Sequence, residues 1–135
     1  DLTRDDISFV NRQRGSGTRM LLDFELKKAN IKLEDINGYS REEFTHTGVA
    51  ASVASGISDV GLGILAAARA LNLDFVPLLK ERYDLIIPNE YYDSDLLTPL
   101  IDIIQDETFK EQIRLLGGYD TSQTGMIIAQ IDQPT

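Results

Sequence analysis

Apolar residues in the first half of the chain occur in runs that alternate between strand length and helix length. Residues 7–10 form an apolar run typical of a strand, and apolar side chains within residues 20–29 recur at helical spacing. The same order returns later, because residues 59–64 indicate a buried strand and the alanine-rich residues 65–71 indicate a helix. This order predicts an α/β fold with a mixed or largely parallel sheet.

Between these two pairs lies a further unit of the same kind. Residues 36–39 are typical of a short strand or a turn, and residues 49–54 carry the pattern of an amphipathic helix. Gly56 follows this helix at the position expected of a C-cap. We therefore expect the helix to end there.

Two apolar segments in the middle of the chain have the composition of strands. They cover residues 73–79 and 83–88, the charged residues 80–82 separate them, and Pro88 ends the second. Their pattern predicts strands at a sheet edge or in a crossover between two parts of the fold.

The last part of the chain favours helices. Leucines and isoleucines recur at helical spacing in residues 95–105 and 108–116, and glycines at positions 117–118 end the second of these segments. We expect one ligand-binding domain over residues 1–129, followed by a frayed tail over residues 130–135.

The charge balance of the chain limits its partners. With 22 acidic and 13 basic residues the formal net charge is −9, so we expect neither nucleic acid nor an anionic membrane to bind this domain. The chain has no cysteine, which excludes disulfides, thiolate metal sites and a cysteine nucleophile. Four arginines nevertheless lie within the first 19 residues, at positions 4, 12, 14 and 19, so the local field there can attract an anion.

The turn at residues 15–19, Gly-Ser-Gly-Thr-Arg, has the composition of an anion-binding loop. It follows a strand-like run and leads into a helix, so the first amides of that helix have no acceptor within it. Its glycines allow a ligand to approach the backbone, and Ser16 and Thr18 add hydroxyls beside Arg19.

Two further turns combine small or hydroxyl-bearing residues with a helix start. Ligands of open α/β sheets gather at the carboxyl ends of the strands, so the three turns together can surround a small anion with backbone donors. The candidate ligand-binding residues are Ser16, Gly17, Thr18, Arg19, Thr45, His46, Thr47, Gly61, Gly63 and Ile64.

Each candidate also has a structural interpretation. The hydroxyl residues can serve as N-caps, the glycines can permit close packing, and the lone histidine can be a hydrogen-bonded structural residue. A catalytic alternative combines Ser16 with His46 and Asp59, although the sequence around Ser16 lacks the nucleophile-elbow pattern. We expect no catalytic residue and no metal ligand in this domain.

The order of the motifs resembles a known family. The blocks lie at residues 9–19, 38–46, 53–63, 73–88 and 118–125, and the first reads FVNRQRGSGTR. Together they are similar to the periplasmic-binding-protein-like domain found in molybdopterin biosynthesis proteins and in helix-turn-helix regulators. This resemblance implies a type II fold related to molybdate and tungstate receptors, with the second lobe and part of the first lobe present here.

The resemblance also implies a function. It is that of a non-enzymatic, cytoplasmic sensor of molybdate, tungstate or a molybdenum-cofactor-related ligand, attached in the parent chain to a biosynthetic enzyme or a helix-turn-helix domain. The related receptors hold their oxyanion with neutral donors, so Arg19 orients the turn. Those receptors often have a tyrosine at the third turn, where this chain has Gly63 and Ile64, so another small anionic metabolite is an alternative ligand.

A complete domain of this family has further sequence before the first block, and we therefore expect this domain to be incomplete at its N-terminal side. Exposed strand edges and apolar surface in an incomplete lobe favour a homodimer. Two alternatives to the sensor remain. One is a structural or oligomerisation module without a ligand, and the other is a solute receptor of an uptake system.

Overall fold

The computed structural model describes residues 1–131, which form two compact units, residues 1–76 and the residues from Pro77 on. A parallel sheet lies at the centre of the first unit. Its strands β1 (Phe9–Arg12), β2 (Glu42–Glu43) and β3 (Val60–Gly61) lie in the order β2-β1-β3. Because the strands are parallel, their carboxyl ends share one edge of the sheet.

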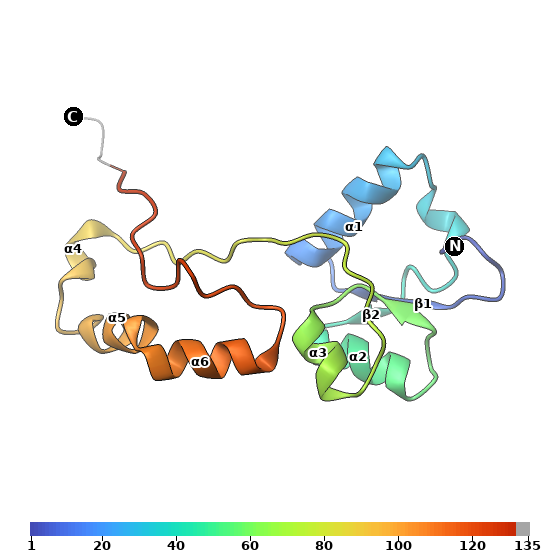
Figure 1. Ribbon diagram of the computed structural model, residues 1–135. Helices are drawn as coiled ribbons and strands as arrows, with labels where there is room; N and C mark the ends of the chain where they lie inside the picture. The colour runs from blue at the N-terminus through green and yellow to red at the C-terminus, as the bar shows by residue number, and fades with distance from the viewer. Residues whose placement is uncertain (132–135) are drawn as a thin grey trace. The chain divides into compact units, whose positions relative to one another are not determined.

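Helices cover both faces of this sheet (Figure 1). Helix α1 (Gly17–Lys28) lies on one face, and helices α2 (His46–Ala54) and α3 (Leu65–Ala70) lie on the other. Strand β1 is buried on both sides, which explains its continuous run of buried residues. Phe9, Leu22, Leu26 and Ile36 form a cluster of buried apolar residues.

Helices α1 and α2 begin and end at residues that local chemistry favours. Ser16 caps α1 and Thr45 caps α2, each through its side-chain oxygen, and two lysines occupy the last turn of α1. Gly56 follows α2 with φ +74°, which confirms the expected helix end there.

The segment between α1 and β2 forms turns. A short 3-10 helix, η1 (Leu33–Asp35), precedes the buried Ile36, and residues 36–39 form a turn, one of the two forms expected from the sequence. Gly38 has φ +89°, and its backbone approaches Phe9 closely. The N–H of Phe9 donates to the carbonyl of Asn37 at 2.8 Å, which joins this turn to the start of β1.

The second unit contains helices without a sheet among its described residues. These helices are α4 (Asn89–Tyr92), α5 (Thr98–Gln105) and α6 (Glu107–Leu116), and α5 and α6 contact each other. Asp106 caps α6 by accepting from the N–H of Phe109 at 3.0 Å, and Gly117 with φ +82° ends that helix. The two helices expected in this region are confirmed, with the first beginning later than expected.

Several sequence expectations were wrong in detail. The runs 73–79 and 83–88 form neither helix nor strand, because an apolar segment becomes a strand only beside a partner strand, and none lies beside them in residues 1–131. The first strand begins at Phe9 rather than at residue 7, and β3 has only two residues. Strand β2 was missed because it consists of two glutamates, which suggest a solvated surface.

Two expectations about the limits of the domain stay open. The single domain over residues 1–129 stays a prediction, and most of the expected tail, residues 132–135, lies outside the described residues.

Within residues 1–131, the helices are too short or too polar to cross a membrane.

Candidate functional site

The three candidate turns lie together at the carboxyl edge of the parallel sheet. The N–H of Gln13, just after β1, donates to the carbonyl of Glu43 at 3.1 Å, and the Nη2 of Arg12 donates to the carbonyl of Phe44 at 3.1 Å. The third turn lies beside the second, because a Cβ placed on Gly63 would be 3.8 Å from the Nδ1 of His46. The starts of α1, α2 and α3 therefore surround one edge of the sheet.

At the start of α1, backbone donors face open space. The Oγ of Ser16 accepts from the N–H of Arg19 at 3.2 Å, as expected of an N-cap, and its own hydroxyl proton is still available to a ligand. Gly17 and Thr18 are the first residues of the helix, where amides have no acceptor within the helix. No atom lies within 4 Å of a Cβ placed on Gly17, so a ligand can approach this turn.

The start of α2 combines donors with a carboxylate. The Oγ1 of Thr45 accepts from the N–H of Gly48 at 2.8 Å, while Thr47 is exposed and His46 is half-buried in the same first turn. The Oε2 of Glu43 would lie only 2.7 Å from a Cβ at Gly48, so this carboxylate rests against the helix start. An anion bound here would meet the negative charge of Glu43.

The third turn contributes mainly backbone. Ile64 is the N-cap residue of α3 and makes no side-chain capping bond. A Cβ on Gly61 would lie 2.5 Å from Cγ1 of Val49 and 2.8 Å from Cγ1 of Val10, so Gly61 permits close packing of α2 on the sheet. Gly63 and Ile64 are the residues of this turn that lie nearest to the helix start.

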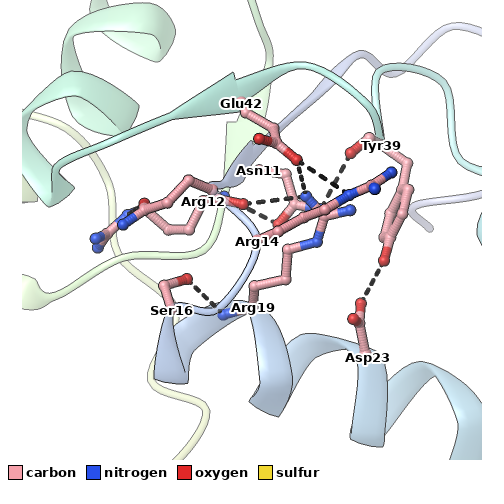
Figure 2. Close-up of polar contacts among 9 residues, drawn as sticks. Asn11, Arg12, Arg14, Ser16, Arg19, Asp23, Tyr39 and Glu42 are labelled. Atoms are coloured by element: carbon pink, nitrogen blue, oxygen red, sulfur yellow. Dashed lines mark hydrogen bonds and ion pairs between the residues drawn. The ribbon is translucent and has the colours of Figure 1, made fainter.

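Arg19 lies inside a polar network rather than at the open edge (Figure 2). Its side chain is only 7% exposed. Its Nη1 donates to Oε1 of Glu42 at 2.5 Å and to the backbone carbonyl of Arg12 at 3.2 Å. Its guanidinium also lies 4.6 Å from the ring centre of Tyr39. Burial acts to lower the pKa of Arg19, but the contacts with Tyr39 and Glu42 outweigh it and raise the pKa above its ordinary value. This geometry suits a residue that orients the turn.

The network continues from Tyr39 to α1. The hydroxyl of Tyr39 donates to Oδ1 of Asp23 at 2.5 Å. The backbone carbonyl of Tyr39 accepts from Nδ2 of the buried Asn11 at 3.1 Å. Burial and the bond to Asp23 raise the pKa of Tyr39. Side chains from α1, β1, β2 and the preceding turn are thus tied together beneath the site.

Arg12 is the residue at this edge that the sequence reasoning missed. Its Nε donates to Oε1 of Gln13 at 3.1 Å and its Nη2 to the carbonyl of Phe44, but its Nη1 is buried and has no hydrogen-bond partner in the part of the chain that the structure describes. A buried N–H donor without an acceptor is costly even when the rest of the guanidinium is bonded, and an anion would satisfy it. The signal in the sequence was the cluster of arginines near the start of the chain.

The structure separates Asp59 from the other two members of the catalytic alternative. Asp59 precedes β3 and lies at the amino end of the sheet, whereas Ser16 and His46 follow carboxyl ends. The Oδ2 of Asp59 accepts from the backbone N–H and the hydroxyl of Ser8, at 2.8 and 2.7 Å, and these bonds lower the pKa of Asp59. Among the described residues, no three acidic or histidine side chains are placed to hold a metal ion.

Comparisons with known proteins agree with this architecture. A family model described as a PBP superfamily domain matches residues 1–105. A Bacillus subtilis (strain 168) protein named "Uncharacterized protein YvgK" is 36% identical over 130 residues, which cover 96% of this chain and 42% of that protein. A Clostridium pasteurianum protein named "Uncharacterized protein in ferredoxin 2Fe-2S gene 5'region" is 41% identical over 113 residues, which cover 83% of this chain and 100% of that protein. No solved structure matches the chain.

Proposed function

The chain belongs to the PBP superfamily, a family of binding folds, and we propose that its first unit is a non-enzymatic sensor that binds a small oxyanion. The ligand we propose is molybdate, tungstate or a molybdenum-cofactor-related anion. The observation that carries the proposal is the convergence of three helix starts at one edge of a parallel sheet, where α/β folds bind their ligands.

The chemistry of this edge suits an oxyanion. The amides of Gly17 and Thr18 and the positive ends of the helix dipoles supply neutral donors, as anion-binding helix starts do. The free Nη1 of Arg12 supplies one charged donor. The ligand therefore satisfies the one buried nitrogen of the half-buried Arg12, while most of its oxygens are held by amides and hydroxyls.

We further propose that the domain is a type II binding fold in which a second lobe closes over the ligand. Binding to both lobes stabilises the closed form, and this change reaches an enzyme or a helix-turn-helix domain attached in a parent chain in the cytoplasm. The Bacillus subtilis relative supports such a parent, because more than half of its length lies outside the match.

We expect calorimetric titration of the chain to show saturable binding of molybdate or tungstate. Arg12→Gln should raise the Kd by about 10- to 150-fold, because a charge-assisted hydrogen bond contributes about 1.5–3 kcal/mol, and Thr18→Val should raise it by about three- to tenfold. Arg4→Gln is the matched control, since Arg4 is exposed and pairs with Asp6 before β1. The proposal fails if no anion, including sulfate and phosphate, gives saturable heat, or if Arg12→Gln and Arg4→Gln bind alike.

Removing the negative charge of Glu43 should strengthen anion binding. Its carboxylate rests against the first turn of α2, so Glu43→Gln should lower the Kd of the anion by about three- to tenfold at low salt, and less at high salt. Glu34→Gln is the control, because Glu34 is exposed in η1 and pairs with Lys32. An equal effect of the two variants would mean that only net charge matters and would remove the start of α2 from the site.

A further inference from the structure

The guanidinium of Arg12 is held on one edge by two oxygens of the chain. Its Nε donates to Oε1 of Gln13 at 3.1 Å, and its Nη2 donates to the backbone carbonyl of Phe44 at 3.1 Å. A guanidinium is planar and rigid, so two bonds on one edge determine where the remaining nitrogen lies. That nitrogen is Nη1, which is buried and has no hydrogen-bond partner among the described residues.

Only one of these two acceptors belongs to a side chain. The carbonyl of Phe44 is part of the backbone that follows β2, so it is present whichever residue stands at that position. The bond to Gln13 depends on the type of residue, because the Nε of an arginine only donates and the side chain opposite it has to offer an oxygen. Position 13 is therefore the place where the sequence controls the orientation of Arg12.

The backbone of Gln13 is fixed at both of its polar groups. Its N–H donates to the carbonyl of Glu43 at 3.1 Å, and its carbonyl accepts from the N–H of Ser16 at 3.2 Å. These two bonds join Gln13 to the last residue of β2 and to the N-cap residue of α1. The half-buried side chain of Gln13 therefore extends from a fixed point toward Arg12.

The end of strand β1 makes the bond between these neighbours possible. Successive side chains of a strand point to opposite faces of the sheet, so two neighbours inside a strand do not reach each other. Strand β1 ends at Arg12, and Gln13 is the first residue after it. The turn that leads to α1 thus brings its first side chain onto the last residue of the strand.

We propose that Gln13 is a positioning residue for anion binding and that it acts through Arg12. This inference rests on the proposed function, in which the Nη1 of Arg12 donates to the bound oxyanion. The bond to Gln13 presents that nitrogen to the ligand in a fixed direction. Without the bond, the ligand has to order a long and flexible side chain as it binds.

Arg14 shows what an arginine lacks when no such bond holds it. Its side chain is 88% exposed, and its Nε lies 3.8 Å from Oε1 of Glu42, which is an ion pair without a hydrogen bond. Arg14 adds positive charge near the same turn, but its direction is not fixed in this way.

Hydrogen exchange at the Nε–H of Arg12 tests the orientation without a ligand. A hydrogen bond to a charged donor protects its proton, so we expect exchange at least about tenfold faster in Gln13→Met than in the parent chain. Gln13→Glu keeps an acceptor oxygen at the same place and should restore slow exchange. Gln112→Met is the matched control and should leave the exchange unchanged, because Gln112 is exposed on α6 in the second unit.

Titration with molybdate and with tungstate tests the effect on binding. Gln13→Met leaves the charge of Arg12 in place, so the Kd should rise by about two- to twelvefold, the effect of ordering one flexible side chain, and by less than in Arg12→Gln. In the Arg12→Gln background, Gln13→Met should leave the Kd unchanged, because the side chain that it orients is gone. A structural role of Gln13 in the turn would weaken binding in both backgrounds.

The outcomes separate this inference from the function on which it rests. A parent chain that binds neither anion overturns the proposed function, and the role of Gln13 falls with it. When the parent chain binds, three results each overturn the role of Gln13 alone. They are an unchanged Kd in Gln13→Met, equal exchange at Arg12 in the two chains, and the same loss of affinity in the Arg12→Gln background.

Discussion

Gly38→Ala is expected to lower the free energy of unfolding of the first unit by about 3–5 kcal/mol. Gly38 has φ +89°, a conformation that costs a residue with a Cβ about 1–2 kcal/mol. Its added Cβ would lie 2.2 Å from the carbonyl oxygen of Phe9, and that neighbour is backbone of the central strand. The turn would have to move away from β1 and lose the bond between Phe9 and Asn37, which adds the cost of an unpaired buried amide.

Two other glycines separate the contributions to this loss. Gly15 has φ +85° but open space around its Cβ position, so Gly15→Ala should cost only the conformational part, about 1 kcal/mol. Gly17 lacks a positive φ and also faces open space, so Gly17→Ala should be neutral or slightly stabilising. Urea unfolding of the three variants checks the order, and a Gly38→Ala loss no larger than that of Gly15→Ala would contradict the close approach to Phe9.

The helices of the first unit could be predicted because their signals are local. Ser16 and Thr45 cap α1 and α2, and Gly56 ends α2, so each boundary depends on residues within one turn of it. The alternation of strands and helices was also sufficient to predict that the three turns would meet, since parallel strands place their carboxyl ends at one edge. The position of the candidate site follows from this order.

What the sequence did not reveal depends on contacts between distant residues. Strand β2 consists of Glu42 and Glu43, and its pairing is supported by the bond of Glu42 to Arg19, 23 positions away. The runs 73–79 and 83–88 have strand composition, but their conformation depends on whether a partner strand is present.

The directions of side chains at the site also escaped the sequence reasoning. Arg12 and Arg19 are both close to the first turn, yet Arg19 is enclosed by Glu42 and Tyr39 while Arg12 keeps one nitrogen without an acceptor among the described residues. Spacing along the chain cannot separate these two environments, because they are set by what packs against each guanidinium. The anion site therefore stays a hypothesis, and the structure adds Arg12 to it as a candidate cation beside the enclosed Arg19.

Arg19→Ala is expected to lower the free energy of unfolding by about 2–4 kcal/mol. Removing one member of a buried ion pair costs about 3–5 kcal/mol, and the 29% exposure of the Glu42 side chain reduces that cost through solvation. The carbonyl of Arg12 also loses its donor, and the ring of Tyr39 loses the guanidinium above it. The loss should appear as a lower urea midpoint with an unchanged slope, because the packed core of Phe9, Leu22 and Leu26 remains.

Arg14 supplies a matched control for this prediction. Its Nε lies 3.8 Å from the same Oε1 of Glu42, but its side chain is 88% exposed, so Arg14→Ala should cost less than about 0.5 kcal/mol. In a double-mutant cycle, Glu42→Gln should cost much less in the Arg19→Ala background than in the parent chain, since its carboxylate has already lost its buried partner. Equal losses for Arg19→Ala and Arg14→Ala would show that burial adds nothing to this ion pair, and the network beneath the site would then not hold β1, β2 and α1 together.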